Sequence, residues 1–457
     1  MSTIDVTFHS LADLLSRARP ADWPVAFASD RVYDWQTLNQ DVAALHNRLS
    51  AHSAQRIALC CDDSYRFAVG FLACAYAGKT LVLPGNSQPA ALEELSAQFD
   101  LMLHDASLSI PAQTDAFEIA IQQNQAAPNW PRLALEELQL VLFTSGSSGT
   151  PKAIHKSLKQ LDVEITILQS LWGATLHGTR IESTVSHQHI YGLLFRLLWP
   201  LCAGRAFAAF NLEFPEQVIA RANEQTTLVS SPALLKRLSE EHHTQPLRQL
   251  FSSGGPLSNA AAEHARRLFG HYPQEVYGST ETGGIAHRQQ FTASQPWRLF
   301  PGVQAKLNSE RCLRLRSPHI DPHHWYQTAD ECYFHDTVTF ELRGRTDRII
   351  KIEEKRVSLT EVEQRVEQLD GVSEAVVIPM QEGERLTLVS VIVLSEAGQH
   401  DLNTLGKGKF WLALRAQLRR WLEPIAVPRR FRIVDSIPLN SQGKRQIADI
   451  EHLFRES

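Results

Sequence analysis

The first part of the chain alternates between two hydrophobic periods. Apolar residues spaced three and four apart predict a helix over residues 37–50, and continuous apolar runs predict buried strands at 56–61 and 80–83. A second helix is expected between these strands, at 65–77. Strand, helix and strand at these lengths are typical of βαβ units, which build parallel sheets.

The same alternation continues towards residue 270. Further helices are expected at 91–99, 158–171, 190–201, 215–223 and 260–268, and further strands at 101–103, 140–143, 180–185, 206–210, 227–230 and 250–255. The pattern weakens between residues 107 and 132, which we interpret as a connector. Helical spacing stops over residues 290–335, where short polar or β-rich runs predict a small β subdomain.

A separate α+β unit is expected after residue 344. Its predicted elements are helices at 359–369 and 405–421 and strands at 375–379, 387–394 and 431–434. We therefore predict an α/β fold with a large N-terminal domain at 1–343, made of βαβ-type parallel sheets plus the β subdomain. The α+β C-terminal domain would span 344–457, a length that folds independently.

Composition describes a globular chain with a sizeable core. Hydrophobic residues make up 43% of the 457 residues, and the net charge of −5 gives no support to a nucleic acid or an anionic membrane as partner. The six cysteines form no CxxC pair, which favours buried thiols in a reducing compartment. The first residues lack the basic flank and apolar core of a signal peptide, and no window reads as a membrane span. We expect a cytoplasmic protein.

The chemistry-bearing stretch is LVLFTSGSSGTPK, residues 140–152. Its apolar start predicts a buried strand, and its two glycines allow backbone N–H groups to turn inward as an anion-binding nest. Lys152 adds a positive charge. A flexible Gly/Ser surface loop is the alternative, but the strand before and the lysine after it favour a phosphate loop. It is not a Walker loop, because Thr150 and Pro151 separate Gly149 from the lysine.

Four further strings follow in order, and together they give a resemblance to a known family. They are VYGSTETG at 276–283, YQTAD at 326–330, GRTDRIIKIEEKRVSLTEVE at 344–363 and PLNSQGK at 438–444. With the phosphate loop, they resemble the adenylate-forming superfamily of acyl-CoA synthetases, luciferases and peptide-synthetase adenylation domains. Five ordered strings covering most of the chain after residue 140 are a specific match.

The resemblance implies a site for ATP and Mg²⁺. The phosphate loop would hold the β- and γ-phosphates, Glu281 would bind magnesium and Thr280 would reach the α-phosphate. Tyr277 would stack on adenine, and Asp330 and Arg345 would share the ribose hydroxyls. The nucleotide-binding residues implied in this way are Thr144, Ser145, Gly146, Ser147, Ser148, Gly149, Thr150, Lys152, Gly255, Tyr277, Gly278, Asp330 and Arg345. Taken singly, the acidic residues could equally be turn or cap carboxylates.

The resemblance also implies a mobile C-terminal domain that carries a catalytic lysine. Lys444 matches the residue that contacts the incoming carboxylate and the α-phosphate, where it would neutralise charge in the transition state. Standing alone it would be read as a surface lysine. Asp347 matches the hinge at which this domain turns between the two half-reactions.

Two departures bear on the substrates. Glu354 stands where the family commonly has a glycine lining the pantetheine tunnel, which puts free CoA in doubt and leaves a carrier-protein pantetheine open. The stretch SHQHIYG, at 186–192, lacks the aspartate that pairs an amino-acid ammonium, so an α-amino acid is not expected. Pocket candidates are His187, His189, Tyr191 and Gly192, although each could be a core residue.

The leading hypothesis is therefore an acid–thiol ligase that activates an aryl or fatty acid through an acyl-AMP, with CoA or a phosphopantetheinylated carrier protein as acceptor. The KIEEKR string is similar to ligases of aryl-polyene pathways. Alternatives are transfer of the acyl group to an amine, and a regulatory nucleotide-binding protein that keeps the fold without turnover.

Overall fold

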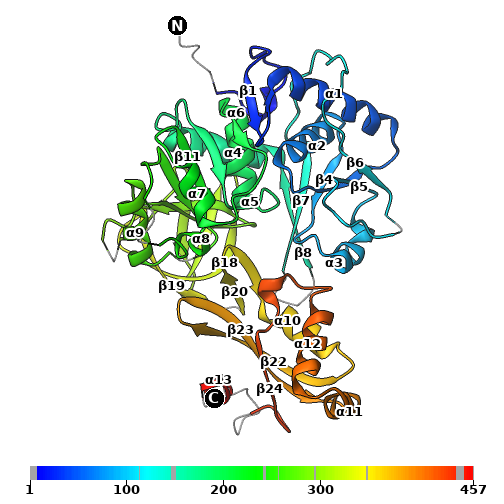
Figure 1. Ribbon diagram of the computed structural model, residues 1–457. Coiled ribbons are helices and arrows are strands. Elements are labelled where there is room, and N and C mark those ends of the chain that lie inside the picture. The colour runs from blue at the N-terminus through cyan, green and yellow to red at the C-terminus, as the bar shows by residue number, and fades with distance from the viewer. Residues whose placement is uncertain are drawn as a thin grey trace. The chain divides into compact units, whose positions relative to one another are not determined.

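The computed structural model describes residues 8–112, 114–145, 151–239, 243–255, 257–292, 295–345, 348–438 and 447–455. The chain divides into two compact units. Unit 1 consists of Met1–Gly85, Ser96–Phe143 and Ala153–Thr346, and unit 2 of Asn86–Leu95, Thr144–Lys152 and Asp347–Ser457. Figure 1 shows the elements of both.

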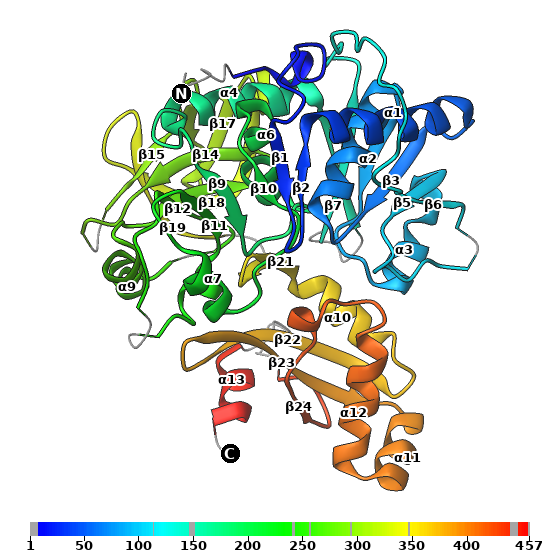
Figure 2. The same ribbon diagram turned by 45° about the horizontal axis from the view of Figure 1, so that its top comes forward.

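One sheet of the large unit has six strands, in the order β6-β5-β3-β4-β7-β8. The pairs that join β6, β5, β3, β4 and β7 are all parallel, as the βαβ pattern predicts. Helix α2 packs on β3 and β4, and α1 packs on α2 (Figure 2). The strands are β3 (Arg56–Cys60), β4 (Thr80–Leu83), β5 (Leu101–His104), β6 (Ala116–Glu118), β7 (Gln139–Ser145) and β8 (Pro151–Ser157).

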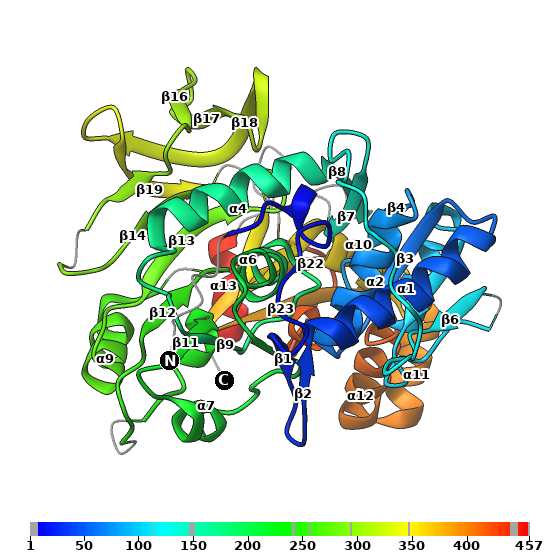
Figure 3. The ribbon, with the colours of Figure 1, turned by 90° about the horizontal axis from the view of Figure 1, so that it is seen from above.

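The other large sheet has thirteen strands, in the order β16-β17-β18-β19-β15-β14-β13-β12-β11-β9-β10-β1-β2. Its middle, from β13 to β1, is parallel, and both flanks are antiparallel. The expected β subdomain corresponds to the antiparallel flank, whose outer strands stand at the top left of Figure 3. The strands are β1 (Pro24–Phe27), β2 (Val32–Asp34), β9 (Arg180–Ser183), β10 (Phe207–Ala208), β11 (Thr226–Ser230), β12 (Gln249–Ser252), β13 (Gln274–Ser279), β14 (Gly283–Arg288), β15 (Trp297–Leu299), β16 (Gln304–Leu307), β17 (Cys312–Ser317), β18 (Asp321–Phe334) and β19 (Thr339–Arg345).

Helix starts in this unit follow local capping rules. Asp34 accepts the Thr37 N–H at 2.8 Å, and Ser157 and Gln160 form a capping box at the start of α4. The helices are α1 (Trp35–Ala51), α2 (Ser64–Tyr76), α4 (Leu158–Trp172), α5 (Ile190–Gly192), a π-helix (Leu193–Leu198), α6 (Trp199–Ala203), α7 (Pro215–Arg221), α8 (Pro232–Leu235) and α9 (Asn259–Phe269).

The C-terminal part of unit 2 is α+β. Strands β22 (Val372–Glu382), β23 (Arg385–Leu394) and β24 (Arg430–Ile433) form one sheet, and β20 (Ile349–Ile352) pairs with β21 (Lys355–Ser358). Helix α10 packs on β22, and α11 packs on α12. The helices are α10 (Leu359–Glu367), α11 (Glu396–Leu405), α12 (Lys407–Leu418) and α13 (Ile447–Arg455); α3 (Pro89–Glu94) also belongs to this unit.

The predicted α/β class is confirmed, and several local expectations differ from the structure. The helix expected at 405–421 is α12, which begins only after Gly406, whose φ is +76°, and ends at Leu418, while helix α11 before it was not expected. The helix expected at 190–201 contains a π-helical segment. Pro151 and Lys152, which we expected to close the phosphate loop, are the first residues of a strand that was not expected, β8. No helix among the described residues is both long enough and apolar enough to cross a membrane.

Candidate functional site

The VYGSTETG string forms a tight hairpin. Strands β13 and β14 pair antiparallel, with Ser279 opposite Gly283, so that Thr280, Glu281 and Thr282 make the turn. Thr280 is half-buried, and Glu281 is 9% exposed. The two side chains expected to act on the nucleotide therefore lie on one short turn.

Two hydroxyls close this turn from inside. The Ser279 N–H donates to Thr282 Oγ1 at 3.1 Å, and the Thr282 N–H donates to Ser279 Oγ at 3.3 Å. Thr282 Oγ1 also donates to the Gly283 carbonyl at 2.8 Å. The turn is thus held by its own side chains, as serine and threonine commonly do.

Tyr277 lies on β13 among aromatic rings. Its ring is 5.5 Å from that of Trp297 and 6.0 Å from that of Phe340, centre to centre. Ser253, just before Gly255, donates to the Val276 carbonyl at 2.8 Å, which ties the loop after β12 to β13. The structure thus brings the segment of Gly255 next to that of Tyr277, and their roles in binding the nucleotide stay predictions.

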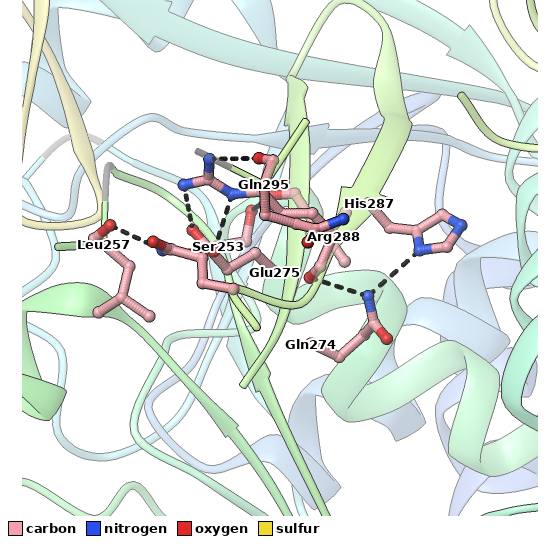
Figure 4. Close-up of polar contacts among 9 residues, drawn as sticks. Ser253, Leu257, Gln274, Glu275, His287, Arg288 and Gln295 are labelled. Carbon is pink, nitrogen blue, oxygen red and sulfur yellow. Dashed lines mark hydrogen bonds and ion pairs between the residues drawn. The ribbon is translucent and has the colours of Figure 1, made fainter. Parts of the chain in front are cut away.

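A buried ion pair supports the same strand, as Figure 4 shows. Arg288 Nε donates to Glu275 Oε1 at 2.9 Å, and the Gln290 amide donates to the same oxygen at 2.7 Å. The Arg288 guanidinium also stacks over Trp297, 4.4 Å from its ring centre. Burial raises the pKa of Glu275, and Arg288 opposes that shift.

Asp330 and Arg345 are paired positions on antiparallel strands. The register of β18 and β19 places Asp330 opposite Arg345. The backbones of the two residues are therefore neighbours, and their roles at a ribose site stay predictions.

Three buried titratable side chains that the sequence did not single out contact the backbone of this hairpin, at Glu281 and at Gly284. Lys156 Nζ donates to the Glu281 carbonyl at 3.0 Å. Glu164 Oε1, on α4, accepts the Gly284 N–H at 2.6 Å. His319 Nε2 donates to the Gly284 carbonyl at 2.9 Å, because a carbonyl can only accept.

These three side chains are almost completely buried. Lys156 is 2% exposed, Glu164 1% and His319 0%. Burial lowers the pKa of Lys156, and the charges of Glu164 and Glu281 oppose this shift. Burial raises the pKa of Glu164 to about 7, against the Gly284 bond and Lys156, and lowers the pKa of His319 to about 4. One signal was visible beforehand, since Glu164 interrupts the apolar stripe of its helix.

His187 is a core residue with both ring nitrogens engaged. Nε2 donates to the Cys61 carbonyl and Nδ1 accepts from Ser64 Oγ, each at 2.8 Å. The ring also packs 4.4 Å from that of Phe67. Burial lowers its pKa well below the usual value, and Arg196 lowers it further. These contacts match the core alternative; a pocket role for His187 stays a prediction.

The other pocket candidates lie at the start of the next helix. His189 precedes α5, and Tyr191 is within it, 5.0 Å from the ring of Phe195. Gly192 is required by a close approach, since a Cβ there would lie 2.0 Å from the Ser186 carbonyl. The SHQHIYG segment is therefore folded back on itself, and its contribution to an acid pocket stays a prediction.

Part of the expected site lies outside the described residues. Gly146, Ser147, Ser148, Gly149, Thr150, Asp347 and Lys444 belong to this part. Thr144 and Ser145 end β7, and Lys152 is an exposed residue of β8. Glu354 lies in the turn between β20 and β21 and is half-buried. The roles of these residues stay predictions.

Glu281 has the chemistry that a magnesium–nucleotide complex needs. The described residues contain no group of three or more His, Cys, Asp and Glu side chains that could hold a metal ion. Mg²⁺ is commonly held by one or two carboxylates, with phosphate oxygens and water completing its octahedron. A single carboxylate on a turn fits that mode and not a cage made only of protein.

Comparison with known families defines the class. Residues 16–313 match the AMP-binding enzyme family, and residues 361–444 match the AMP-binding enzyme C-terminal domain. The chain belongs to the AMP-binding enzyme family. This confirms the predicted membership of the adenylate-forming superfamily; neither family match bears on the aryl-polyene branch.

Named relatives are distant but cover most of the chain. A 4-coumarate–CoA ligase of Halorhodospira halophila is 28% identical over 67% of this chain and 75% of its own. An anthranilate–CoA ligase of Pseudomonas aeruginosa is 25% identical, over 87% of both chains. MmaC of Mycobacterium marinum, a fatty acid–[acyl-carrier-protein] ligase, is 24% identical over 86% of this chain and 87% of its own.

Solved structures share the fold. The amide bond synthetase McbA from Marinactinospora thermotolerans has a TM-score of 0.79 at 18% identity, covering 97% of this chain and 99% of its own. The o-succinylbenzoate CoA synthetase MenE of Bacillus subtilis has a TM-score of 0.80 at 18% identity, covering 96% and 98%.

Proposed function

We propose that this protein is an ATP-dependent ligase that activates a carboxylic acid as its acyl-AMP and passes the acyl group to a pantetheine thiol. The observation that carries the proposal is the braced turn of Thr280 and Glu281, beside Tyr277, in a member of the AMP-binding enzyme family. In the first step a carboxylate oxygen attacks the α-phosphorus, and pyrophosphate leaves. In the second step the thiolate attacks the acyl carbon, and AMP leaves.

Each of the candidate nucleotide-binding and catalytic residues has a distinct part in this proposal. Thr280 would donate a hydrogen bond to an α-phosphate oxygen, and Glu281 would hold Mg²⁺, which would supply charge neutralisation on the phosphates. Tyr277 packs against adenine, and Asp330 accepts from the ribose. Lys152 and the phosphate loop hold the leaving pyrophosphate. Lys444 offsets the charge that builds as two anions meet.

The substrate class proposed is an aryl or fatty acid. The SHQHIYG segment offers no carboxylate for an ammonium group, which argues against α-amino acids. Relatives named for coumarate, anthranilate and fatty acids support both remaining classes. For the acceptor, Glu354 in place of a tunnel glycine favours carrier-protein pantetheine over free CoA.

Carboxylate-dependent exchange of labelled pyrophosphate into ATP tests the first step. A panel of aryl and fatty acids should give exchange with at least one member and none with α-amino acids. Folded protein that binds ATP yet exchanges with no acid would contradict the ligase and favour a regulatory nucleotide-binding protein.

A second assay tests the acceptor. The adenylated acid is offered to CoA, to a phosphopantetheinylated carrier protein and to a simple amine, with wild type and Glu354→Gly compared. We expect transfer to the carrier, and a gain in CoA turnover in the variant. Efficient CoA turnover by wild type would show that Glu354 does not narrow the tunnel, and transfer to the amine alone would identify an amide-forming ligase.

A further inference from the structure

The hairpin turn of residues 279–284 rests on a buried set of Lys156, Glu164 and His319, which we name the support cluster. Its three members come from strand β8, helix α4 and the segment after β17. They converge on two residues of the turn, Glu281 and Gly284. All five residues belong to unit 1.

The contacts go to the backbone of the turn. Lys156 donates to the Glu281 carbonyl. Glu164 accepts from the Gly284 N–H, and His319 donates to the Gly284 carbonyl. Backbone contacts fix where the chain runs, whatever the side chain at that position does. The backbone is thus held at Glu281 by the ammonium group of Lys156. Three residues later, at Gly284, both the N–H and the carbonyl are held.

The fit of Glu164 is close. A Cβ at Gly283 would lie 2.1 Å from Glu164 Oε2, and Gly283 has a φ of +67°. The carboxylate therefore sits directly against the glycine backbone, in space that another residue at position 283 would fill. His319 is itself oriented by Ser317, whose Oγ lies 3.0 Å from His319 Nδ1.

Such a cluster is a poor means of adding stability. Burying charged groups carries a desolvation cost that an ion pair often does not recover, and apolar residues of similar volume commonly serve stability as well or better. A polar cluster that is hydrogen-bonded throughout does, however, hold one geometry. This contrast indicates that the support cluster serves to place the turn and not to stabilise the core.

We infer that Lys156, Glu164 and His319 are positioning residues, which set the turn so that Glu281 and Thr280 meet the magnesium–nucleotide complex. The inference rests on the proposed function for the identity of that complex. None of the three needs to touch nucleotide or acid. Their effect passes through the backbone of residues 281–284, as supporting groups behind a metal ligand act.

The test measures how much Mg²⁺ improves nucleotide binding, which requires no turnover. A non-hydrolysable ATP analogue is titrated by calorimetry with and without MgCl₂, in full-length wild type and in Lys156→Met, Glu164→Ala and Glu164→Gln. We expect the Mg²⁺-dependent gain in affinity to fall about tenfold or more in Lys156→Met and Glu164→Ala, as for other supporting partners of metal ligands. Affinity without Mg²⁺ should fall by less than the Mg²⁺-dependent gain, because only the Thr280 contact contributes to it.

Glu164→Gln is the conservative rescue, because its amide oxygen can still accept the Gly284 N–H. We expect it to keep most of the gain. Glu182→Gln is the matched control: Glu182 is fully buried and lies 3.2 Å from Arg221, away from the turn. It should lower the thermal midpoint while leaving the Mg²⁺-dependent gain unchanged.

Pyrophosphate exchange separates this inference from the proposed function. In an active wild type, the positioning variants should lower kcat and raise the KM for Mg·ATP, with the KM for the acid unchanged. The inference would be overturned if Lys156→Met and Glu164→Ala folded and kept the wild-type Mg²⁺-dependent gain in affinity. It would also be overturned if Glu182→Gln lost as much of this gain as they do. If the wild type showed the Mg²⁺-dependent gain in affinity but no pyrophosphate exchange, only the proposed ligase function would be overturned. The variants would still decide the role of the cluster.

Discussion

At the scale of single residues, Gly283 offers a direct measure of how tightly the turn is packed. Its φ of +67° is costly for any residue with a Cβ, and the new Cβ would also lie 2.1 Å from Glu164. We predict that Gly283→Ala lowers the free energy of unfolding by about 2–4 kcal/mol, the strain plus the displaced hydrogen bond. Urea denaturation monitored by tryptophan fluorescence measures it.

The matched control is Gly302→Ala. Gly302 has a φ of +80°, but a Cβ at this position would meet nothing within 4 Å, so this variant carries the backbone strain alone. The difference between the two variants isolates the clash with Glu164. Equal losses would mean that the Glu164 carboxylate moves aside freely, against the packing described above.

His187 predicts a pH dependence of stability. Because its folded-state pKa is well below 6.5, the unfolded chain binds more protons below that pH, so stability falls as the pH drops from about 6.5. One group contributes at most about 1.4 kcal/mol per pH unit in this window. His187→Asn should flatten the fall in unfolding free energy between pH 6.5 and 5, measured by urea denaturation at each pH. An unchanged slope would show that folding does not lower the pKa of His187.

At the scale of elements, the π-helix within residues 190–203 has an identifiable cause. Pro200 lacks an N–H and its ring clashes with the carbonyl four residues earlier, that of Arg196, so a regular α-helix cannot run through. The widened turn places Arg196 in the core, where it donates to the carbonyls of Val185, Ala208 and Phe210 and to the Asn211 side chain. Burial lowers its pKa to about 9.

Replacing Arg196 by lysine should therefore be damaging despite the retained charge. The ammonium group of a lysine lacks the planar set of N–H donors with which the Arg196 guanidinium reaches four acceptors. Buried carbonyls would therefore lose their hydrogen-bond partners. We predict that Arg196→Lys lowers the free energy of unfolding by about 3 kcal/mol or more. Arg205→Lys should cost less in the same urea titration, because Arg205 serves only the Leu176 and Gly173 carbonyls among the described residues. Equal losses would contradict the counting of acceptors.

Sequence patterns predicted those elements whose signal is local. Strand β4 has the bounds expected, and α1 and α2 differ from expectation by a residue or two, because apolar spacing and caps lie within each element. Strand β8 was missed because PKAIHKS contains a buried lysine where an apolar residue would mark the inner face. Helix α12 was expected from residue 405 and begins instead after Gly406, a glycine that the apolar spacing does not mark as a boundary.

At the scale of the whole molecule, the candidate site divides in the same way. Thr280, Glu281 and Tyr277 could be named from the sequence because they share one string. Lys156 and Glu164 could not, because they reach the turn across 125 and 120 residues of chain, and only the tertiary fold brings them there. A charged residue in an apolar stripe indicates that such a partner exists without identifying it.

The proposed division of labour between the two half-reactions gives the last prediction. Lys444 would offset charge only while the carboxylate attacks the α-phosphate, so Lys444→Ala should lower pyrophosphate exchange by about 10²–10³. Nucleotide affinity should change little, and transfer from a synthetic acyl-AMP to the pantetheine thiol should survive, because that step forms no new bond to phosphorus. Lys407→Ala removes an exposed lysine of the same unit and should leave both assays unchanged. If Lys444→Ala lost both half-reactions equally, the lysine would serve binding or folding, and the charge that permits adenylation would have to come from another cation.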